Sequence, residues 1–275
     1  MLEERQGFDR LSPNGYLEQL GIVRILITND DGIGAPGIYV LEKIAAQLSD
    51  DIWIVAPAEE QSGAGHSLTL TRPIRLRQHA EKRFSVSGTP TDAVTMALKK
   101  VLPEPPDLIL SGVNRGANLG DDVTYSGTVA AAMEGALAGV RSIALSQVYS
   151  HEESGDRVSF DAAEEWGAKV IRPLVDLPFA SRTLINVNFP PLRAVDVRGI
   201  RVVRQGFHDY SRGSLVENVD PRGFAYFWFG LHAAEQTAGH ETDLEVIADG
   251  FISVTPLQLD LTHYPSLDAL AGRYT

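Results

Sequence analysis

The sequence contains no cysteine, and that absence excludes several kinds of chemistry. A chain without thiols forms no disulfide, offers no thiolate nucleophile and holds no zinc ion through sulfur. The absence does not by itself decide the compartment in which the protein works.

Basic residues are few and scattered. Lys and Arg number 24 against 36 Asp and Glu, which gives a formal net charge of −12 at pH 7. Non-specific binding to nucleic acid depends on basic side chains that neutralise phosphates, so we expect no nucleic-acid polymer as a partner. The overall charge would also repel an anionic substrate. Local positive charge would therefore have to come from a metal ion or a helix N-terminus.

Long hydrophobic runs are also missing. No apolar stretch reaches the roughly 20 residues that a membrane span needs. The first six residues, MLEERQ, are charged and lack the apolar centre of a secretory signal. We therefore expect a cytoplasmic protein with no membrane partner.

The 275 residues, of which 44% are apolar, suffice for one large domain with an extension. Residues 1–21 are polar and are expected to be an N-terminal extension outside the fold that need not be ordered. Strand and helix patterns alternate over residues 22–190, and this predicts an α/β fold with a doubly wound, mostly parallel sheet. Residues 191–275 are expected to be a β-rich extension with a C-terminal segment.

The element predictions follow from apolar periodicity and from turn residues. Expected core strands are residues 22–28, 51–57, 107–111, 142–146 and 183–189, with helices from 38 to 48, from Pro90, over 129–139, near 160–175 and over 266–274. Residues 68–87 are expected to be β-structure, and residues 199–204, 223–229 and 251–254 are strand-like. The aromatic strand FAYFWF (224–229) is apolar on both faces, so it is either core of the extension or a subunit interface.

Two adjacent carboxylates, Asp30 and Asp31, follow the first expected strand, within the stretch NDDGIGAPG (29–37). Ligands bind at the carboxyl ends of the strands in an open parallel sheet. Neighbouring carboxylates repel each other, and a shared cation would relieve that repulsion. The alternative is that these residues only form a turn and a helix cap.

Two further loops leave the carboxyl ends of expected core strands and carry Ser62 and Asn114. If the loops converge with Asp30 and Asp31, they supply two carboxylates, a hydroxyl and an amide oxygen. These hard oxygen donors suit one Mg²⁺ or Mn²⁺ ion that retains several waters. Taken singly, Ser62 and Asn114 can equally be plain loop residues.

A fourth loop, Ser126-Gly127-Thr128, opens the helix expected over residues 129–139. Its hydroxyls and unpaired backbone N–H groups form a ready site for a phosphate, although an ordinary helix cap has the same residues. A metal and an anion site in one cleft indicate phosphoryl-group chemistry. The nucleophile would be a water oriented at the site, or a carboxylate of Asp30 or Asp31 that forms a covalent intermediate.

A competing pattern overlaps this stretch. Gly32, Gly34 and Gly37 fit G-x-G-x-x-G between a strand and a helix, the fingerprint of an NAD(P)-binding Rossmann enzyme. Glu59 matches the more distant acidic residue of that fingerprint. The objection is electrostatic, because the two carboxylates just before Gly32 would repel a pyrophosphate.

Two histidines stand near these loops. His66 follows the Ser62 loop and is expected to make a local hydrogen bond rather than to reach substrate. His208-Asp209 resembles a metal-dependent phosphohydrolase pair, but it lies in the β-rich part without the helices that such a site needs. We interpret it as a loop feature.

The sequence resembles the SurE family of survival-protein 5′-nucleotidases over roughly residues 22–262. The matching stretches are ITNDDG (27–32) with APG (35–37), VAP (55–57) with SG (62–63), GTPTD (88–92), the block 111–135 with NLGDD (118–122) and YSGTVAAAMEG (125–135), TD (242–243), and SVTPL (253–257) with DLT (260–262). Residues 1–21 precede the usual start of the family, and we assign them no role.

The resemblance implies a Rossmann-like α/β core with a β-hairpin extension and a C-terminal segment that take part in a homodimer or homotetramer. It implies release of phosphate from nucleoside 5′-monophosphates with one divalent ion per subunit. Some members of the family also act on 3′-nucleotides or short polyphosphate. The implied metal ligands are Asp30, Asp31, Ser62 and Asn114, and the implied phosphate site is Ser126, Gly127 and Thr128 with Asn118 nearby. Residues 205–220 vary within the family and are expected to help set the base preference.

Overall fold

The computed structural model describes residues 24–149, 159–208, 213–231 and 241–274. The predictions made for residues 1–21 and for Asp209 lie outside the described residues.

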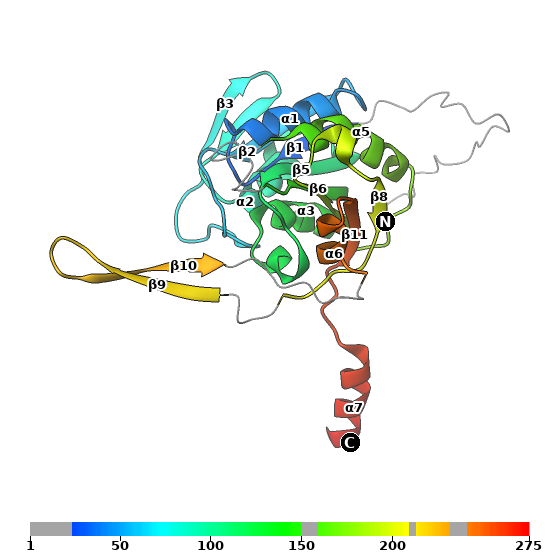
Figure 1. Cartoon of the computed structure of the whole chain (residues 1–275). Helices are drawn as coiled ribbons and strands as arrows, with labels where there is room; N and C mark the ends of the chain where they lie inside the picture. Colours follow the sequence, from blue (N-terminus) through cyan, green and yellow to red (C-terminus); the bar gives the residue numbers. More distant parts are fainter. Residues whose placement is uncertain (1–23, 150–158, 209–212, 232–240, 275) are drawn as a thin grey trace.

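A nine-stranded sheet with the order β3-β4-β2-β1-β5-β6-β7-β11-β8 forms the centre of the fold (Figure 1). Its strands are β1 (Ile25–Thr28), β2 (Ile52–Pro57), β3 (Leu76–Ala80), β4 (Arg83–Val86), β5 (Leu108–Arg115), β6 (Arg141–Gln147), β7 (Thr183–Phe189), β8 (Ile200–Val202) and β11 (Ile252–Gln258). The six strands from β4 to β7 in this order are parallel, whereas β3 and β11 pair antiparallel with β4 and β7. The predicted doubly wound, mostly parallel sheet is confirmed.

Helices cover both faces of this sheet. On one face lie α1 (Pro36–Ala45) and α5 (Asp161–Val175), and their apolar side chains share one core cluster with the strands. On the other face lie α2 (Pro90–Met96) and α3 (Gly127–Leu137). Three short helical segments are not α-helical: η1 (Ala97–Val101) is a π-helix that continues α2, and η2 (Gly120–Thr124) and η3 (Ala194–Asp196) are 3-10 helices.

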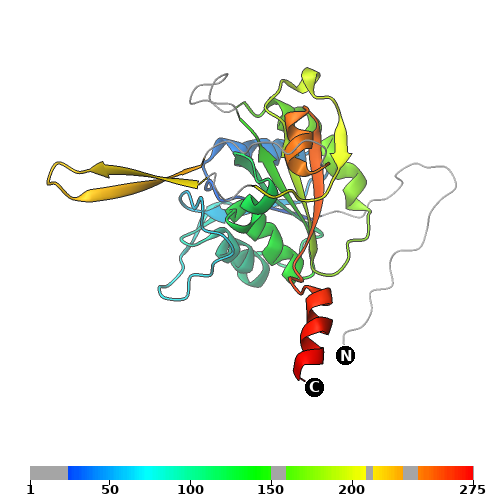
Figure 2. The same cartoon turned by 60° about the horizontal axis from the view of Figure 1, so that its bottom comes forward.

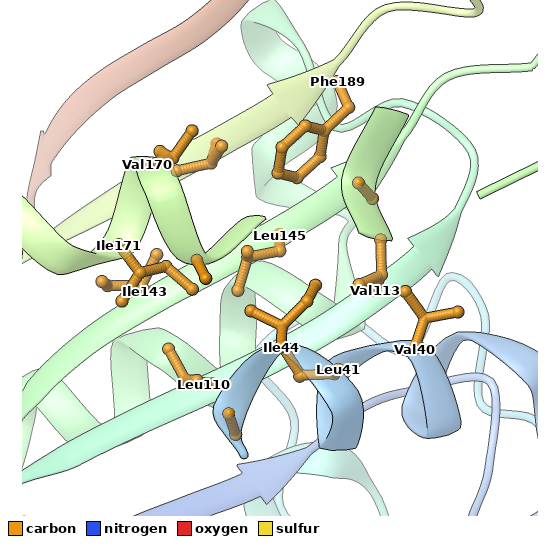
Figure 3. Packing of buried hydrophobic residues seen from close by; sticks show 14 of the residues in the cluster. Val40, Leu41, Ile44, Leu110, Val113, Ile143, Leu145, Val170, Ile171 and Phe189 are labelled. Atoms are coloured by element: carbon orange, nitrogen blue, oxygen red, sulfur yellow. The ribbon is translucent and has the colours of Figure 1, made fainter. Parts of the chain in front are cut away.

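Helix α1 packs closely on β5, and this contact sets the position of the loop before it. Leu41 and Ile44 are fully buried and point toward strand residues (Figure 3). Burial of one such side chain contributes about 1.5–3 kcal/mol. A Cβ on Gly37 would lie 1.9 Å from the carbonyl oxygen of Val113, so only glycine permits this approach.

The order of the strands creates a crevice beside β1. The chain places β2 on one side of β1 and then β5 on the other, and both pair with β1 in parallel. Such a reversal of strand order leaves a crevice outside the carboxyl ends of the two central strands. The loops that follow β1 and β5 therefore meet at one point of the sheet edge.

Two strand predictions are wrong in detail. Residues 68–70 form a loop, and the backbone N–H of Thr69 donates to the Asp92 side chain rather than to a neighbouring strand. Strand β5 continues to Arg115, beyond the predicted end at Ser111. Its register with β6 shifts between Ser111 and Asn114, so the strand passes an irregularity and pairs again. Apolar alternation locates a strand, but pairing with a neighbour decides where it ends.

The region after residue 190 is partly built into the core. Strands β8 and β11 join the main sheet, and the short helix α6 (Asp243–Ala248), which the sequence reading missed, packs beside β11. The predicted C-terminal helix is confirmed as α7 (Tyr264–Tyr274). The predicted domain boundary at residue 190 stays a prediction.

A two-stranded hairpin of β9 (Gly213–Val219) and β10 (Ala225–Leu231) extends away from the body, as does α7 (Figures 1 and 2). Trp228 is paired with Val216 and Phe229 with Leu215, and all four side chains are exposed. The hairpin is thus apolar on both faces, and the alternative that it forms a core is wrong for the single chain. Within the described residues, no helix combines the length and the apolar character that crossing a membrane requires.

Candidate active site

The turn after β1 positions the two adjacent carboxylates. The side chain of Asn29 donates to the carbonyl of Gly32 at 2.8 Å and accepts from its N–H at 3.2 Å. Gly32 has a φ of +101°, a conformation that favours glycine. As a result Asp30 is buried, with 4% of its surface exposed, while Asp31 is half-buried at the edge of the sheet.

Asp30 contacts the start of helix α3. The hydroxyl of Thr128 donates a hydrogen bond to the Asp30 carboxylate. A Cβ on Gly127 would lie 2.7 Å from the Cβ of Asp30, so the helix backbone passes directly beside this side chain. Ser126 caps the helix, because its hydroxyl oxygen accepts from the N–H of Val129 at 3.0 Å. The structure therefore brings a predicted metal ligand and the predicted phosphate turn into direct contact.

The loop after β2 carries Ser62 and is held to the same place. The backbone N–H of Gln61 donates to the carbonyl of Asp30 at 2.8 Å. The N–H of Gly65 donates to the carbonyl of Tyr125, which directly precedes the phosphate turn, at 3.1 Å. The Ser62 hydroxyl donates to the Glu60 carboxylate at 2.8 Å and keeps its own oxygen as an acceptor.

Asn114 lies on strand β5 rather than in the loop where it was predicted, opposite Ser146 of β6. Its amide nitrogen donates to the carbonyl of Gly116 at 3.0 Å, which orients the side chain and leaves the amide oxygen as an acceptor. The next residue, Arg115, donates its backbone N–H to the Asp31 carboxylate at 3.1 Å. This bond joins the end of β5 to the turn after β1.

Both carboxylates are less acidic than ordinary aspartates. Burial raises the pKa of Asp30 to about 6, with a further contribution from the charge of Asp31, while the hydroxyl of Thr128 opposes the rise. Burial also raises the pKa of Asp31, and the charge of Glu60 adds to it, whereas Arg115 lowers it. Two neighbouring groups that resist ionisation are stabilised as carboxylates by a cation.

The donor set fits a hard divalent cation. Asp30 and Asp31 offer carboxylate oxygens, and Ser62 and Asn114 offer a hydroxyl and an oriented amide oxygen. Within the described residues, no group of three or more His, Cys, Asp or Glu side chains is arranged to hold a metal ion. A metal at this site would therefore depend on the neutral oxygens and on water as well as on the two carboxylates.

Asn118 is buried in a network that fixes the loop before the phosphate turn. Its side-chain nitrogen donates to Ser146 at 2.8 Å, and its N–H donates to Asn188 at 2.9 Å. Its carbonyl accepts from Asn186 at 2.7 Å and from Asn188 at 3.1 Å. The sequence reading missed Asn186 and Asn188, although polar residues inside an otherwise apolar strand were a usable signal. A role of Asn118 in phosphate binding stays a prediction.

His66 makes a hydrogen bond within the protein, as expected, but its partner is distant in sequence rather than local. Its Nε2 lies 3.1 Å from the Glu134 carboxylate on helix α3, and this hydrogen bond lowers the pKa of Glu134. Thr95 of helix α2 also donates to Glu134, at 3.2 Å. The contact connects the Ser62 loop to the helix whose first turn faces Asp30.

His208 is a loop residue, as interpreted, and it joins the segment before the hairpin to the loop before α3. Its side chain is almost fully buried, and both its Nδ1 and its backbone N lie 2.8 Å from the Asp121 carboxylate. Asp243 of helix α6 reinforces this junction, because it accepts from the N–H of Gly120 at 2.9 Å and from that of Gly206 at 2.7 Å.

Glu60 and Arg115 are the charged residues at this site that the sequence reading missed. The guanidinium of Arg115 lies 3.6 Å from the Glu60 carboxylate, and both side chains are about half exposed. Their signal in the sequence was only adjacency: Glu60 is two residues before Ser62, and Arg115 directly follows Asn114.

Comparisons with known proteins agree with these features. A family model described as "Survival protein SurE" matches residues 25–212. A protein of Erythrobacter litoralis named 5′-nucleotidase SurE is 66% identical over 253 residues, which cover 92% of this chain and all of that protein. A 5′-nucleotidase SurE from Rhizorhabdus wittichii is 63% identical over 253 residues, which again cover 92% of this chain and all of that protein. The crystal structure of the SurE protein from Aquifex aeolicus matches with a TM-score of 0.79 and 36% identity, over 92% of this chain and all of that chain.

Proposed function

This chain belongs to the survival protein SurE family, and on that premise we propose that it is a metal-dependent 5′-nucleotidase. The reaction releases phosphate from a nucleoside 5′-monophosphate and leaves the nucleoside. The enzyme class agrees with the names of the similar proteins, whereas the metal and the range of substrates are our own inference.

The contact between Asp30 and the first turn of α3 is the observation that carries the proposal. A buried carboxylate beside a helix N-terminus competes with any other anion for the same N–H groups. With a cation on the carboxylate side, the same turn becomes able to accept a phosphate. The neighbouring arrangement of Asp30, Gly127 and Thr128 therefore supports a site at which a cation and a phosphate ester are bound together.

The residues take separate roles in this proposal. Asp30, Asp31, Ser62 and Asn114 would hold one Mg²⁺ or Mn²⁺ ion per subunit. When bound, the ion would polarise a phosphoryl oxygen and offset the charge that builds up in the transition state. Ser126, Gly127 and Thr128 would bind the phosphoryl oxygens through N–H and hydroxyl groups, with Asn118 holding the preceding loop in place.

The wider predictions from the sequence remain predictions. They are activity toward 3′-nucleotides or short polyphosphate, a cytoplasmic location, and assembly into a homodimer or homotetramer. The exposed apolar side chains of the β9–β10 hairpin support the assembly, because water contact with so many of them is unfavourable.

Phosphate release from a panel of nucleotides, with and without a chelator, tests the proposal. We expect release from 5′-monophosphates such as AMP, its loss with the chelator and its recovery with added Mg²⁺ or Mn²⁺. A 5′-deoxynucleoside, which has no phosphate, serves as a ligand control. It should bind weakly if the phosphate provides most of the binding affinity. Unchanged activity in the chelator contradicts metal dependence, and absence of release with any metal contradicts the nucleotidase itself.

A further inference from the structure

The carboxylates at the site make the binding of a phosphate ester electrostatically difficult. Asp30, Asp31 and Glu60 lie close enough together that the charge of Glu60 raises the pKa of Asp31. A divalent ion offsets two negative charges, and the substrate phosphate brings up to two more. The chain as a whole is also negative, with a formal charge of −12.

The first turn of α3 uses part of its hydrogen-bonding capacity within the protein. The hydroxyl of Thr128 donates to Asp30, and the N–H of Val129 donates to Ser126 at 3.0 Å. A phosphate monoester presents three terminal oxygens, each able to accept more than one hydrogen bond. Complete binding of those oxygens therefore needs donors from another element.

Arg115 is placed to supply them. Its backbone N–H donates to Asp31 at 3.1 Å, which fixes the start of the side chain beside the carboxylates. Its guanidinium is close enough to lower the pKa of Asp31, yet 54% of the side chain is exposed. A guanidinium binds two phosphate oxygens at once through a planar pair of N–H groups.

The present partner of Arg115 holds it loosely. The distance of 3.6 Å from the guanidinium to the Glu60 carboxylate exceeds the usual 2.7–3.2 Å of an N–H···O hydrogen bond. The same carboxylate oxygen accepts a closer bond from Ser62, at 2.8 Å. Exposed ion pairs of this kind contribute little to stability, so exchange of the carboxylate for a phosphate costs little.

We propose that Arg115 is a phosphate-binding residue of this site, paired with Glu60 in the free protein and transferred to the phosphoryl oxygens of the substrate. Glu60 then retains its bond to Ser62 and keeps that predicted metal ligand in place. The identity of the substrate as a nucleoside monophosphate rests on the proposed function. The role of Arg115 toward a phosphate group can be measured without turnover.

Calorimetric titration of the Mn²⁺-loaded protein with inorganic phosphate tests the proposal. We expect Arg115→Gln to weaken phosphate binding by about tenfold or more, and Arg115→Lys to fall between it and the wild type because a single ammonium lacks the paired donors. Glu60→Gln should tighten binding, since it removes the competing charge and can still accept from Ser62. A matched control is Lys43→Gln, which removes a similarly exposed cation paired with Glu164 at 2.8 Å in the last turn of α1, away from the site.

Phosphate affinity in Arg115→Gln equal to that of the wild type overturns the inference, as does a wild-type protein that binds no phosphate. Thermal unfolding of each variant identifies loss of the fold, and Arg115→Lys keeps the test decisive if Arg115→Gln does not fold. Hydrolysis of AMP separates this inference from the proposed function. An active wild type with an unaltered Arg115→Gln refutes only the role of Arg115, whereas phosphate binding without hydrolysis refutes only the nucleotidase.

Discussion

The hydroxyl of Thr128 donates a hydrogen bond to the carboxylate of Asp30, across 98 residues of sequence. The bond joins the turn after the first strand to the first turn of helix α3. It also favours the charged form of a carboxylate whose burial favours the neutral one. Through this contact, the predicted cation and phosphate sites are parts of one structure.

Two replacements of Thr128 distinguish the contribution of its hydroxyl from that of its side-chain volume. Thr128→Val keeps the volume but leaves a buried carboxylate without its donor, which costs about 1–3 kcal/mol of stability. We expect phosphate release from AMP to fall clearly in this variant and to survive within a few fold in Thr128→Ser. Urea unfolding and steady-state kinetics measure the two effects. Equal activity in both variants would mean that the hydrogen bond to Asp30 is dispensable.

Asp30→Asn should abolish activity while preserving the fold. Loss of a residue that only supports a metal ligand typically lowers metal affinity or activity by about 10–100-fold. Loss of a ligand itself should therefore lower the rate of phosphate release by more than about 100-fold. Thermal stabilisation by added Mn²⁺ should shrink as well, because a ligand stabilises only the state that binds it. Full activity in Asp30→Asn would refute the site assignment.

The same variant gives a prediction for pH dependence. The pKa of Asp30 is about 6 in the folded, metal-free protein against 3.8 in the unfolded chain. Between these two pH values the folded protein keeps a proton on Asp30 that the unfolded chain has released. The free energy of unfolding therefore falls as the pH rises, and the contribution of this proton is lost above pH 6. The difference between the folded and unfolded pKa of Asp30 corresponds to about 3 kcal/mol of stability, at about 1.36 kcal/mol per pKa unit.

Asp30→Asn has no such proton to lose. In urea unfolding with a chelator present, its stability relative to the wild type should therefore increase by about 3 kcal/mol between pH 3.5 and pH 7. Added Mn²⁺ at pH 7 should reverse the order by stabilising the wild type. A stability difference that stays constant over this pH range would contradict the raised pKa.

The glycines after Asp31 distinguish the metal site from a dinucleotide site. Gly34 has open space where a Cβ would stand, so Gly34→Ala should retain stability within about 0.5 kcal/mol and keep full phosphate release. A dinucleotide fingerprint needs its second glycine for the approach of the pyrophosphate, so that alternative predicts lost NAD(H) binding. Gly37→Ala is the contrasting variant, because its Cβ would overlap the carbonyl of Val113 and should prevent folding. NAD(H) binding by the wild type that is lost in a folded Gly34→Ala would favour the dinucleotide alternative.

The hairpin predicts an assembly that mass measurement can detect. Trp228 and Phe229 are 67% and 88% exposed on opposite faces of β10. Sedimentation at micromolar concentration should show a homodimer or homotetramer for the wild type, and a smaller species for Trp228→Ser/Phe229→Ser. Tyr39→Ser, an exposed aromatic change on α1, is the control and should leave the mass unchanged. A monomeric wild type would contradict the interface.

The sequence predicted those elements of the fold that depend on apolar periodicity and on capping residues within one short segment. The first strand, Ile25–Thr28, lies within a mostly apolar run, and the helix expected from Pro90 begins there in the structure, with Thr89 as its N-cap. Residues 68–70 alternate equally well, yet no neighbouring strand pairs with them there, and they form a loop. The continuation of β5 to Arg115 depends on pairing with β6 beyond a register shift, which no local pattern reveals.

Apolar periodicity and turn residues were enough to predict the type of fold and the oxygen donors near strand ends, and the sequence motifs carried the family resemblance. Three contacts arise only in the folded chain: Thr128 with Asp30, His66 with Glu134, and Arg115 with Glu60. These pairs are far apart in sequence, and their contact depends on how helices pack on the sheet. The burial that raises the pKa of Asp30 likewise arises only when the sheet, its loops and α3 enclose that side chain.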